Sequence, residues 1–261
     1  MSLEGKVALV TGSTSGIGLA IARAFAAEGC NVMLNGLGDA GAIAKLREVI
    51  ARQHGVKVEY HGANMTRPAE IAALVAETRA KLGGVDILVN NAGIQHVAKV
   101  ENFPPEKWDA IIAVNLSSSF HTIRAALPVM KAKGWGRIIN VASTHGLVAS
   151  GEKTAYVAAK HGLIGLTKSV SIECADTGVT CNAICPGWVL TPLVQAQVDA
   201  RAKAQGISAE QSAKNLIAEK QPQLQFTRPE QIAGLAVFLA SDTASNMQGA
   251  QLVSDGGWTS Q

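Results

Sequence analysis

The chain has 261 residues, of which 48% are hydrophobic and 16% are charged, so it can bury a large core and lacks the composition of a disordered protein. Its 23 basic and 20 acidic residues are scattered and leave a net charge of +3, with no basic run that would hold a nucleic-acid backbone. The longest uncharged stretch, residues 179–198, contains Asn182 and the Pro186-Gly187 pair, which a membrane helix would tolerate poorly. We therefore expect a globular protein that binds neither nucleic acid nor a membrane.

Short apolar runs alternate with helical patterns along the chain. Seven runs predict strands, at residues 7–11, 31–35, 56–60, 86–90, 137–143, 179–185 and 251–257. Six patterns predict helices, at residues 16–28, 40–53, 68–82, 105–133, 154–175 and 229–240. This alternation is typical of βαβ units, in which crossover helices join parallel strands. The predicted fold is α/β: one doubly wound domain over residues 1–261, with a seven-stranded parallel sheet flanked by helices.

One segment breaks the alternation. Residues 189–225 are rich in Gln, Ala and Lys and separate the sixth strand from the last βα unit. Their length and polarity predict one or two helices over the edge of the sheet, forming a lid near residues 188–220.

The cysteines and the first residues bear on the compartment. Cys30, Cys174, Cys181 and Cys185 have neither the spacing of a metal site nor the density of a disulfide scaffold, so we expect reduced, buried thiols and no metal ion. The opening "MSLEGKVALVTG" has too short an apolar core for a secretory signal. A cytoplasmic protein is expected.

A glycine-rich loop follows the first strand. In "TGSTSGIG", Gly12, Gly16 and Gly18 lie between a predicted strand and a predicted helix, and Ser13, Thr14 and Ser15 add hydroxyl donors. Glycines let the main chain approach a phosphate, while the start of the helix offers free N–H groups and a partial positive charge. The loop predicts a dinucleotide site.

The end of the second strand bears on which dinucleotide is bound. An acid there usually binds the ribose 2′-OH of NAD, and a basic residue the 2′-phosphate of NADP. Here "LNGLGDAG" offers neither at Asn35, Gly36 or Leu37, and Asp39 is the nearest carboxylate. Because no cation would compensate a 2′-phosphate for its lost water, the sequence favours NAD.

Tyr156 and Lys160 stand four residues apart on a predicted helix, so their side chains can meet. A phenol that serves as a base near neutral pH needs a pKa about three units below its usual 10, or roughly 4 kcal/mol. One cation about 5 Å away contributes roughly 3.3 kcal/mol at an effective dielectric constant near 20, and the positive nicotinamide ring of an oxidised cofactor could supply the remainder. The pair alone is more often a surface contact. Ser143, at the end of the fifth strand where such sheets place their ligands, favours a proton-transfer site.

Asn115 is the fourth polar residue of interest. It lies in "VNLSSSF" on a predicted long helix, where an asparagine is unfavourable unless its amide has a buried partner. With "TGSTSGIG", "NNAG" at 90–93, Ser143, the Tyr156/Lys160 pair and "PG" at 186–187, the chain resembles the short-chain dehydrogenase/reductase family over nearly its whole length. The resemblance implies a Rossmann-type fold.

Family resemblance also implies roles for these residues. Tyr156 would be the acid/base, Ser143 would position the substrate oxygen, Lys160 would hold the cofactor ribose and lower the tyrosine pKa, and Asn115 would seat a relay water. The implied cofactor contacts are Gly12, Thr14, Ser15, Gly16, Ile17, Gly18, Leu37, Asn64, Met65, Asn91, Ala92, Gly93, Tyr156, Lys160, Pro186, Gly187, Val189 and Thr191. Two departures stand out: Asn64 replaces the usual Asp after strand three, and the acid after strand two is missing.

The substrate end of the cleft is predicted from polar residues near the catalytic group. Lys153 offers a charge to a carboxylate, and Gln95, His145 and Gln197 offer hydrogen bonds. Trp188 provides an apolar wall that limits size. Each has an ordinary structural alternative, and His96 is interpreted as structural. Together they predict a nest for a small anion.

The sequence leaves three hypotheses for the function of the protein. The first is reversible NAD-dependent oxidation of a small hydroxy acid by a homotetramer, the assembly that the resemblance implies through the helices at 105–133 and 154–175. The second is another reductase of the same fold, for example one acting on acetoacetyl-CoA, which would be expected to carry basic residues for the CoA phosphates. The third is a non-catalytic dinucleotide sensor, whose expected mark is an incomplete catalytic set.

Overall fold

The computed structural model describes residues 3–260, so residues 1, 2 and 261 of the predicted domain lie outside it. The strands are β1 (Val7–Val10), β2 (Asn31–Asn35), β3 (Val58–His61), β4 (Ile87–Asn90), β5 (Gly136–Val141), β6 (Val179–Pro186) and β7 (Gln251–Ser254). The α-helices are α1 (Gly16–Ala27), α2 (Ala40–His54), α3 (Pro68–Leu82), α4 (Pro105–Ile112), α5 (Ser118–Lys133), α6 (Thr154–Cys174), α7 (Pro192–Gln205), α8 (Ala209–Ala218) and α9 (Pro229–Ala240).

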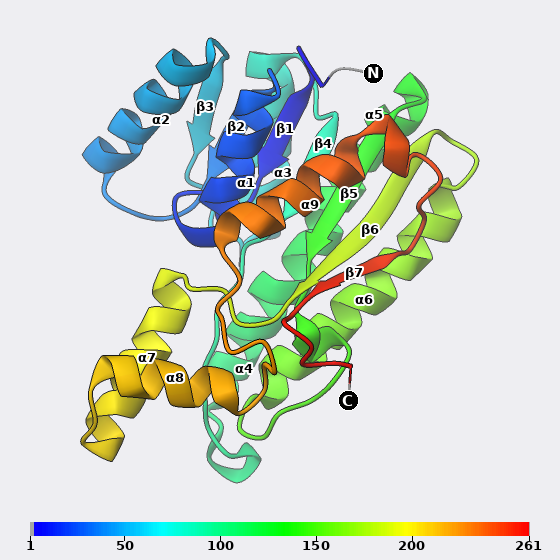
Figure 1. The fold of residues 1–261 in the computed structure, drawn as a ribbon. Coiled ribbons are helices and arrows are strands. Elements are labelled where there is room, and N and C mark those ends of the chain that lie inside the picture. The colour runs from blue at the N-terminus through cyan, green and yellow to red at the C-terminus, as the bar shows by residue number, and fades with distance from the viewer. Residues whose placement is uncertain (1–2, 261) are drawn as a thin grey trace.

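The strands form one sheet in the order β3-β2-β1-β4-β5-β6-β7, with all neighbours parallel, which confirms the predicted seven-stranded parallel sheet (Figure 1). Leu9 of β1 is in register with Met33 of β2 on one side and with Leu88 of β4 on the other. The strand order reverses at β1, because β2 leads away in one direction and β4 in the other. Open α/β sheets bind their ligands at such a switch point, beyond the carboxyl ends of the strands.

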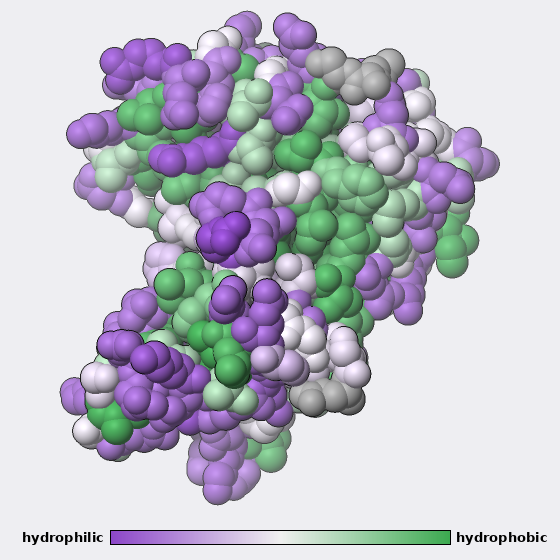
Figure 2. Space-filling view, in the orientation of Figure 1, coloured by the Kyte–Doolittle hydropathy of each residue, from purple (hydrophilic) through white to green (hydrophobic). Residues whose placement is uncertain are grey.

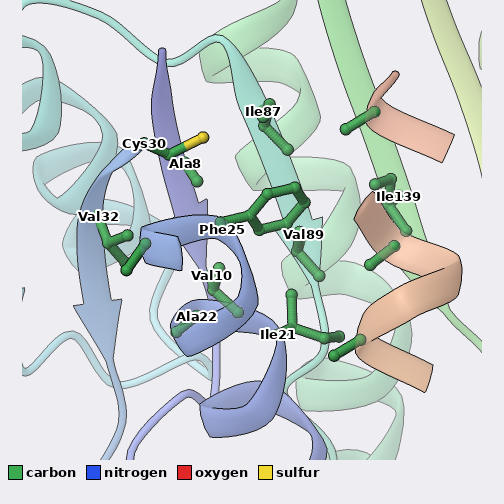
Figure 3. Packing of buried hydrophobic residues seen from close by; sticks show 14 of the residues in the cluster. Ala8, Val10, Ile21, Ala22, Phe25, Cys30, Val32, Ile87, Val89 and Ile139 are labelled. Atoms are coloured by element: carbon green, nitrogen blue, oxygen red, sulfur yellow. The ribbon is translucent and has the colours of Figure 1, made fainter. Parts of the chain in front are cut away.

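Helices cover both faces of the sheet. Successive strand residues point to opposite faces, so Ala8 and Val10 pack under α1, α2 and α9, whereas Leu9 packs against α3 and α5. Phe25 of α1 is fully buried and lies over β1 and β4 beside Ile87 and Val89 (Figure 3). This packing fixes α1, and with it the loop that joins α1 to β1.

The helix predicted over residues 105–133 is present, but it contains a π-helical segment that the sequence did not reveal. Helix α4 ends at Ile112, a π-helical segment η2 (Ala113–Ser117) follows, and α5 begins at Ser118. Asn115 lies inside η2, where its Oδ1 accepts from the Ile94 N–H at 2.9 Å and its Nδ2 donates to the Ile94 carbonyl at 3.0 Å. A tertiary partner therefore accompanies the π turn, a feature that is frequent at functional sites.

Strand β1 ends one residue earlier than predicted, at Val10, and strands β5 and β7 end two or three residues earlier. Strand β7 stops at Ser254 and not at 257, because Gly256 and Gly257 have φ values of +61° and +90° and the Asp255 carboxylate accepts from the Gly257 N–H. Strand β5 stops at Val141 and not at 143, and Ser143 instead caps the short 3-10 helix η3 (Thr144–Gly146).

The segment that breaks the βα alternation forms α7 and α8, which stand away from the sheet in Figure 1. Ser208 caps α8 by accepting from the Gln211 N–H, and Thr191 caps α7 by accepting from the Val194 N–H. Both helices pack on a small apolar cluster that includes Trp188 and Trp258. A single parallel bridge between Val189 and Thr227 joins the two ends of the segment. The segment predicted to form a lid is thus a pair of helices held by one small apolar cluster and one β-bridge.

Within residues 3–260, no helix is both long and apolar enough to cross a membrane. The four cysteines are buried and unpaired. The described part of the chain contains no group of three His, Cys, Asp or Glu residues placed to hold a metal ion.

Candidate active site

A cavity of about 410 Å³ lies beyond the carboxyl ends of β1, β4, β5 and β6. Figure 2 shows the surface hollowed between the sheet and the α7–α8 segment. Every site residue predicted from the sequence lines this cavity except Ser13, Gly18 and Asn115, and the buried Ser13 hydroxyl donates instead to the Val10 carbonyl. Residues that sequence reasoning did not place there also line it, namely Asn35, Gly36, Ala63, Ile94, Val114, Val141, Ala142, Thr144, Pro192, Leu193, Val194 and Trp258.

The glycine-rich loop passes directly under the segment that follows β4. Gly12 has φ +62°, and a Cβ there would lie 2.9 Å from the Ala92 Cα. Asn91 holds the loop in place, since its Nδ2 donates to the carbonyls of Thr11 at 2.9 Å and Gly12 at 3.0 Å. Its amide is therefore turned toward the loop, although the residue lines the cavity.

Gly18 does not line the cavity. A Cβ at this position would lie 2.3 Å from the Gly12 carbonyl oxygen and 2.4 Å from the Asn91 Nδ2. The third glycine of the motif is thus needed for close packing of α1 against the loop and not for contact with a ligand.

The start of α1 suits an anion. Its first turn has no acidic residue, and Ser15 at the N-cap makes no side-chain hydrogen bond to the helix. The first N–H groups of a helix have no intrahelical partner and carry a partial positive charge. The residues of this turn that line the cavity, together with the missing Cβ at Gly12, therefore fit a dinucleotide pyrophosphate.

The far end of the cavity is uncharged. Leu37 is 74% exposed. Asn64 bonds the turn before α3, since its Oδ1 accepts from the N–H and hydroxyl of Thr66. Asp39 caps α2 by accepting from the Ala42 N–H. The basic residues that line the described cavity, His145, Lys153 and Lys160, all lie at its other end, around Tyr156.

Asn35, at the end of β2 where an acid was absent from the sequence, has a structural role. Its Oδ1 accepts from the Gly12 N–H at 3.3 Å, and its Nδ2 donates to the carbonyls of His61 at 3.0 Å and Ala63 at 3.1 Å. The side chain is fully buried. It therefore fastens the glycine loop to β2 and to the end of β3.

Tyr156, Ser143 and Lys160 come together at the carboxyl ends of β5 and β6. The Ser143 hydroxyl hydrogen-bonds the Tyr156 phenol. The Lys160 Nζ lies 5.6 Å from the centroid of the Tyr156 ring and donates to the Val141 carbonyl at 2.8 Å. Spacing of four residues on α6 thus gives the predicted pairing.

The expected depression of the tyrosine pKa is not a property of the protein alone. Burial raises the pKa of Tyr156 to about 12, and the Ser143 hydrogen bond only partly opposes this. Burial also lowers the pKa of Lys160 to about 8. Desolvation disfavours both charged forms, so Tyr156 is a phenol at neutral pH and a proton donor.

Asn115 contributes to the catalytic site through the backbone of a cavity-lining residue. Both polar atoms of its side chain are bonded to Ile94, the residue after "NNAG". The amide therefore fixes the wall of the cavity, and its predicted part in a proton relay remains a prediction.

The predicted substrate residues line the same cavity as Tyr156. The Lys153 Nζ lies 4.6 Å from the centroid of the Trp188 ring, over its face. The Gln197 Nε2 lies 3.5 Å from the Gln95 Oε1, and the Nε2 of Gln95 is buried without a partner. Gln95 therefore has an unused donor in the cavity.

The charge states here differ from those of free side chains. Burial, aided by the nearby Lys153 charge, lowers the pKa of His145 to about 3, so the imidazole is neutral and serves as a hydrogen-bonding group. Its Nε2 lies 2.9 Å from the Ser150 hydroxyl. Burial lowers the pKa of Lys153 to about 8, opposed by the carboxylate of Glu219. Lys153 thus carries a charge at neutral pH and loses it in mild alkali.

Trp258 is the main residue that sequence reasoning missed. Its ring stacks on Trp188 with centroids 5.8 Å apart and meets His145 edge-on at 5.1 Å. His145 in turn meets Tyr156 edge-on at 5.9 Å. The only signal in the sequence is the terminal "DGGW", in which an aromatic residue follows a turn. His96 lies against Phe103 and does not line the cavity.

Proteins with similar sequences are described as reductases or dehydrogenases. The sequence family described as "Enoyl-(Acyl carrier protein) reductase" matches residues 12–259. D-beta-hydroxybutyrate dehydrogenase of Cupriavidus necator is 61% identical over 99% of this chain and 100% of its own. The D-beta-hydroxybutyrate dehydrogenase of Rhizobium meliloti is 56% identical over 98% and 99%.

Solved structures agree on the fold. L-sorbose reductase of Gluconobacter frateurii, solved with NADPH and L-sorbose, superposes with a TM-score of 0.94 at 30% identity over all of both chains. An actinorhodin polyketide ketoreductase solved with NADPH gives a TM-score of 0.92 at 33% identity over 98% of each chain. The chain belongs to the short-chain dehydrogenase/reductase family.

Proposed function

We propose that this protein is an NAD-dependent dehydrogenase that interconverts D-3-hydroxybutyrate and acetoacetate. One observation carries the proposal: a lysine ammonium and a set of neutral hydrogen-bonding side chains line the same cavity as the Tyr156–Ser143 pair. The identity of 61% to a relative described as D-beta-hydroxybutyrate dehydrogenase supports the same substrate.

Tyr156 moves the proton. In reduction the neutral phenol donates its proton to the carbonyl oxygen, while the Ser143 hydroxyl holds that oxygen in place. In oxidation the phenol must first lose its proton, so this direction is favoured as the pH rises. When bound, oxidised NAD supplies the hydride acceptor and a positive charge beside the phenol. The Lys160 ammonium, 5.6 Å from the ring, adds attraction of roughly 3 kcal/mol to the phenolate at a dielectric constant near 20.

The carboxylate of the substrate is bound by a separate group of residues, which does not include Tyr156 or Ser143. Lys153 provides the charge, and Gln95, His145 and Gln197 provide hydrogen bonds. Anchoring a four-carbon acid at its charged end and at its C3 oxygen leaves one face of C3 toward the cofactor. The enantiomer is thereby selected by orientation. The stacked indoles of Trp188 and Trp258 bound the space that remains for the methyl group.

NAD is proposed over NADP from the charge at the adenosine end. The residues that line this end include Leu37, Asn64 and Met65, all uncharged, whereas the basic lining residues surround Tyr156. A 2′-phosphate at Leu37 would find no cation among the residues that line this end of the cavity. The NADPH found in two solved relatives is a property of those proteins.

The proposal also covers the oligomeric state of the protein and its location in the cell. Helices α4, α5 and α6 carry large apolar side chains that remain exposed in the single chain, namely Trp108, Phe120 and Ile172. These faces support a homotetramer built partly through these helices. Four buried, unpaired cysteines support a cytoplasmic protein. The chain is proposed to act as a single catalytic domain.

A spectrophotometric assay tests the function. Mixing the protein with NAD and each enantiomer of 3-hydroxybutyrate should produce NADH absorbance at 340 nm with the D form alone. NADP in place of NAD should lower kcat/KM by about 100-fold, because no lining residue at the adenosine end pairs with the charge of the 2′-phosphate. Activity with acetoacetyl-CoA and NADPH, and none with D-3-hydroxybutyrate, would favour the rival reductase. Dinucleotide binding without turnover would favour the sensor.

The charge of Lys153 predicts a pH dependence of substrate binding. The pKa of Lys153 is lowered to about 8, so its attraction for a carboxylate is present below that pH and lost above it. The KM for D-3-hydroxybutyrate should rise about tenfold between pH 7 and pH 9, since the substrate itself stays ionised. Lys153→Arg, which stays charged, should flatten the profile. An identical rise in the arginine variant would show that another group is titrating.

A further inference from the structure

Gln221 is a buried glutamine at the base of the α7–α8 segment, and the catalytic chemistry does not use it. It lies in "EKQPQLQF", just after α8, and is 1% exposed. Its Oε1 accepts from the backbone N–H of Trp188 at 2.5 Å, and its Nε2 donates to the Gln225 carbonyl at 2.7 Å. The single amide thus bonds both ends of the segment.

Two glycines approach this amide from other parts of the chain. A Cβ at Gly187 would lie 2.7 Å from the Gln221 Oε1, and a Cβ at Gly256 would lie 3.0 Å from its Nε2. The two loops also bond to each other, since the Gly187 N–H donates to the Ser254 carbonyl at 2.9 Å. Gln221 is therefore enclosed by the loop before Trp188 and by the loop before Trp258.

These two loops carry the stacked indoles of the substrate pocket. Trp188 is fixed through its backbone, because its N–H goes to Gln221 and its carbonyl accepts from the Thr227 N–H at 2.9 Å. Its ring supports the Lys153 ammonium at 4.6 Å and stacks on Trp258 at 5.8 Å. A shift of the Trp188 backbone would therefore move the apolar wall and the cation together.

We propose that Gln221 is a positioning residue that sets the separation of Trp188 and Trp258, and thereby limits the length of the hydroxy acid that the cavity accepts. This inference rests on the proposed function and assigns a residue to its chain-length selectivity. Gln221 acts through the backbone of Trp188 and touches neither the carboxylate nor the reacting carbon.

The test compares two Gln→Met variants, Gln221→Met and Gln225→Met. The second is the matched control, because the Gln225 side chain is exposed and only its backbone carbonyl meets Gln221. The probes are D-3-hydroxybutyrate and D-3-hydroxypentanoate, which is one methylene longer. Gln221→Met should raise the KM for the four-carbon acid about tenfold, the size expected when a buried N–H loses its acceptor, with kcat within about threefold.

Selectivity gives a readout that a loss of stability would not move. Wild type and Gln225→Met should prefer the four-carbon acid, whereas Gln221→Met should narrow the ratio of the two kcat/KM values by about fivefold or more. Binding of NADH, followed by its fluorescence, should be unchanged in all three proteins. A Gln221→Met enzyme with wild-type KM and selectivity would overturn the inference, as would a fall in kcat with KM unchanged.

A double-variant cycle tests whether the effect passes through Trp188. In a Trp188→Ala background, Gln221→Met should change KM less than about twofold, since the indole that it positions is gone. A full tenfold change there would contradict the inference. If Gln221→Met does not fold, Gln221→Asn serves instead, because it keeps both polar groups but withdraws them by one methylene.

The outcomes separate this inference from the proposed function. Wild-type protein that oxidises neither hydroxy acid contradicts the proposed function. Wild-type protein that oxidises the four-carbon acid, with Gln221→Met indistinguishable from it, contradicts only the role of Gln221.

Discussion

Replacing Tyr156 by phenylalanine is expected to lower kcat by about 10³-fold or more while the dissociation constant for NAD stays within about threefold. The change removes one hydroxyl, which is the group bonded to Ser143, and keeps the ring that packs edge-on against His145. General acid–base catalysis by a positioned side chain is worth about 10²–10⁴-fold. Steady-state kinetics with D-3-hydroxybutyrate and a fluorescence titration with NADH provide the two numbers.

The chain contains a matched control in its other tyrosine. The Tyr60 hydroxyl donates to the Gly36 carbonyl at 2.8 Å, and Tyr60 does not line the cavity. Tyr60→Phe should therefore keep kcat within about threefold of wild type, because one part-buried hydrogen bond is worth about 1 kcal/mol and is remote from the chemistry. Equal losses of kcat in both variants would remove Tyr156 from its role.

Gly18→Ala should weaken NAD binding by about 100-fold or more. The added Cβ would lie 2.3 Å from the Gly12 carbonyl oxygen and 2.4 Å from the Asn91 Nδ2, so α1 and the glycine loop must separate. A displacement of about 1 Å moves the pyrophosphate away from the helix start, and misplacements of that size cost about 10²-fold elsewhere. Isothermal titration with NAD measures the loss directly.

Gly234→Ala on α9 is the corresponding control. A Cβ there has no heavy atom within 4 Å among the described residues, and alanine is more favourable than glycine inside a helix by about 1 kcal/mol. It should bind NAD as wild type does, with an equal or higher melting temperature. Gly18→Ala with wild-type affinity would mean that the close packing behind the loop is not what holds it in place.

The parallel sheet was predictable because its evidence is local. Each strand is a short apolar run, each crossover has a helical period, and the parallel order follows once strands and helices alternate. The glycine loop and the Tyr156–Lys160 spacing are also local, and the structure brings both to one cavity. Ser143 could be placed because strand ends meet at one edge of the sheet.

The features that were missed depend on contacts between distant segments. The π turn at Asn115 is accompanied by the backbone of Ile94, 21 residues earlier, and no window around Asn115 contains that information. The stacking of Trp258 on Trp188 joins residues 70 positions apart in the chain. In the sequence Gln221 is one of several polar residues in a polar segment, and only the structure shows that its amide bonds the backbone of Trp188.

The pKa of Tyr156 in the cofactor-free chain could not be predicted from the sequence, for a different reason. Coulomb attraction to Lys160 could be estimated from helical spacing, but the cost of burying the phenol depends on the whole surrounding fold. Burial dominates and raises the pKa of Tyr156 to about 12. The end of β7 at Ser254, in contrast, could have been found locally, because the Asp255-Gly256-Gly257 run is a turn signal.

Transfer of an isotopic label from C3 of the substrate to the cofactor tests the central claim most directly. D-3-hydroxybutyrate deuterated at C3 is incubated with wild-type protein and NAD, and the reduced cofactor is analysed by mass spectrometry. We expect one deuterium in each NADH formed, none from the L enantiomer, and no labelled cofactor with Tyr156→Phe on the same timescale. Unlabelled NADH, equal labelling from both enantiomers, or undiminished labelling with Tyr156→Phe would contradict the account.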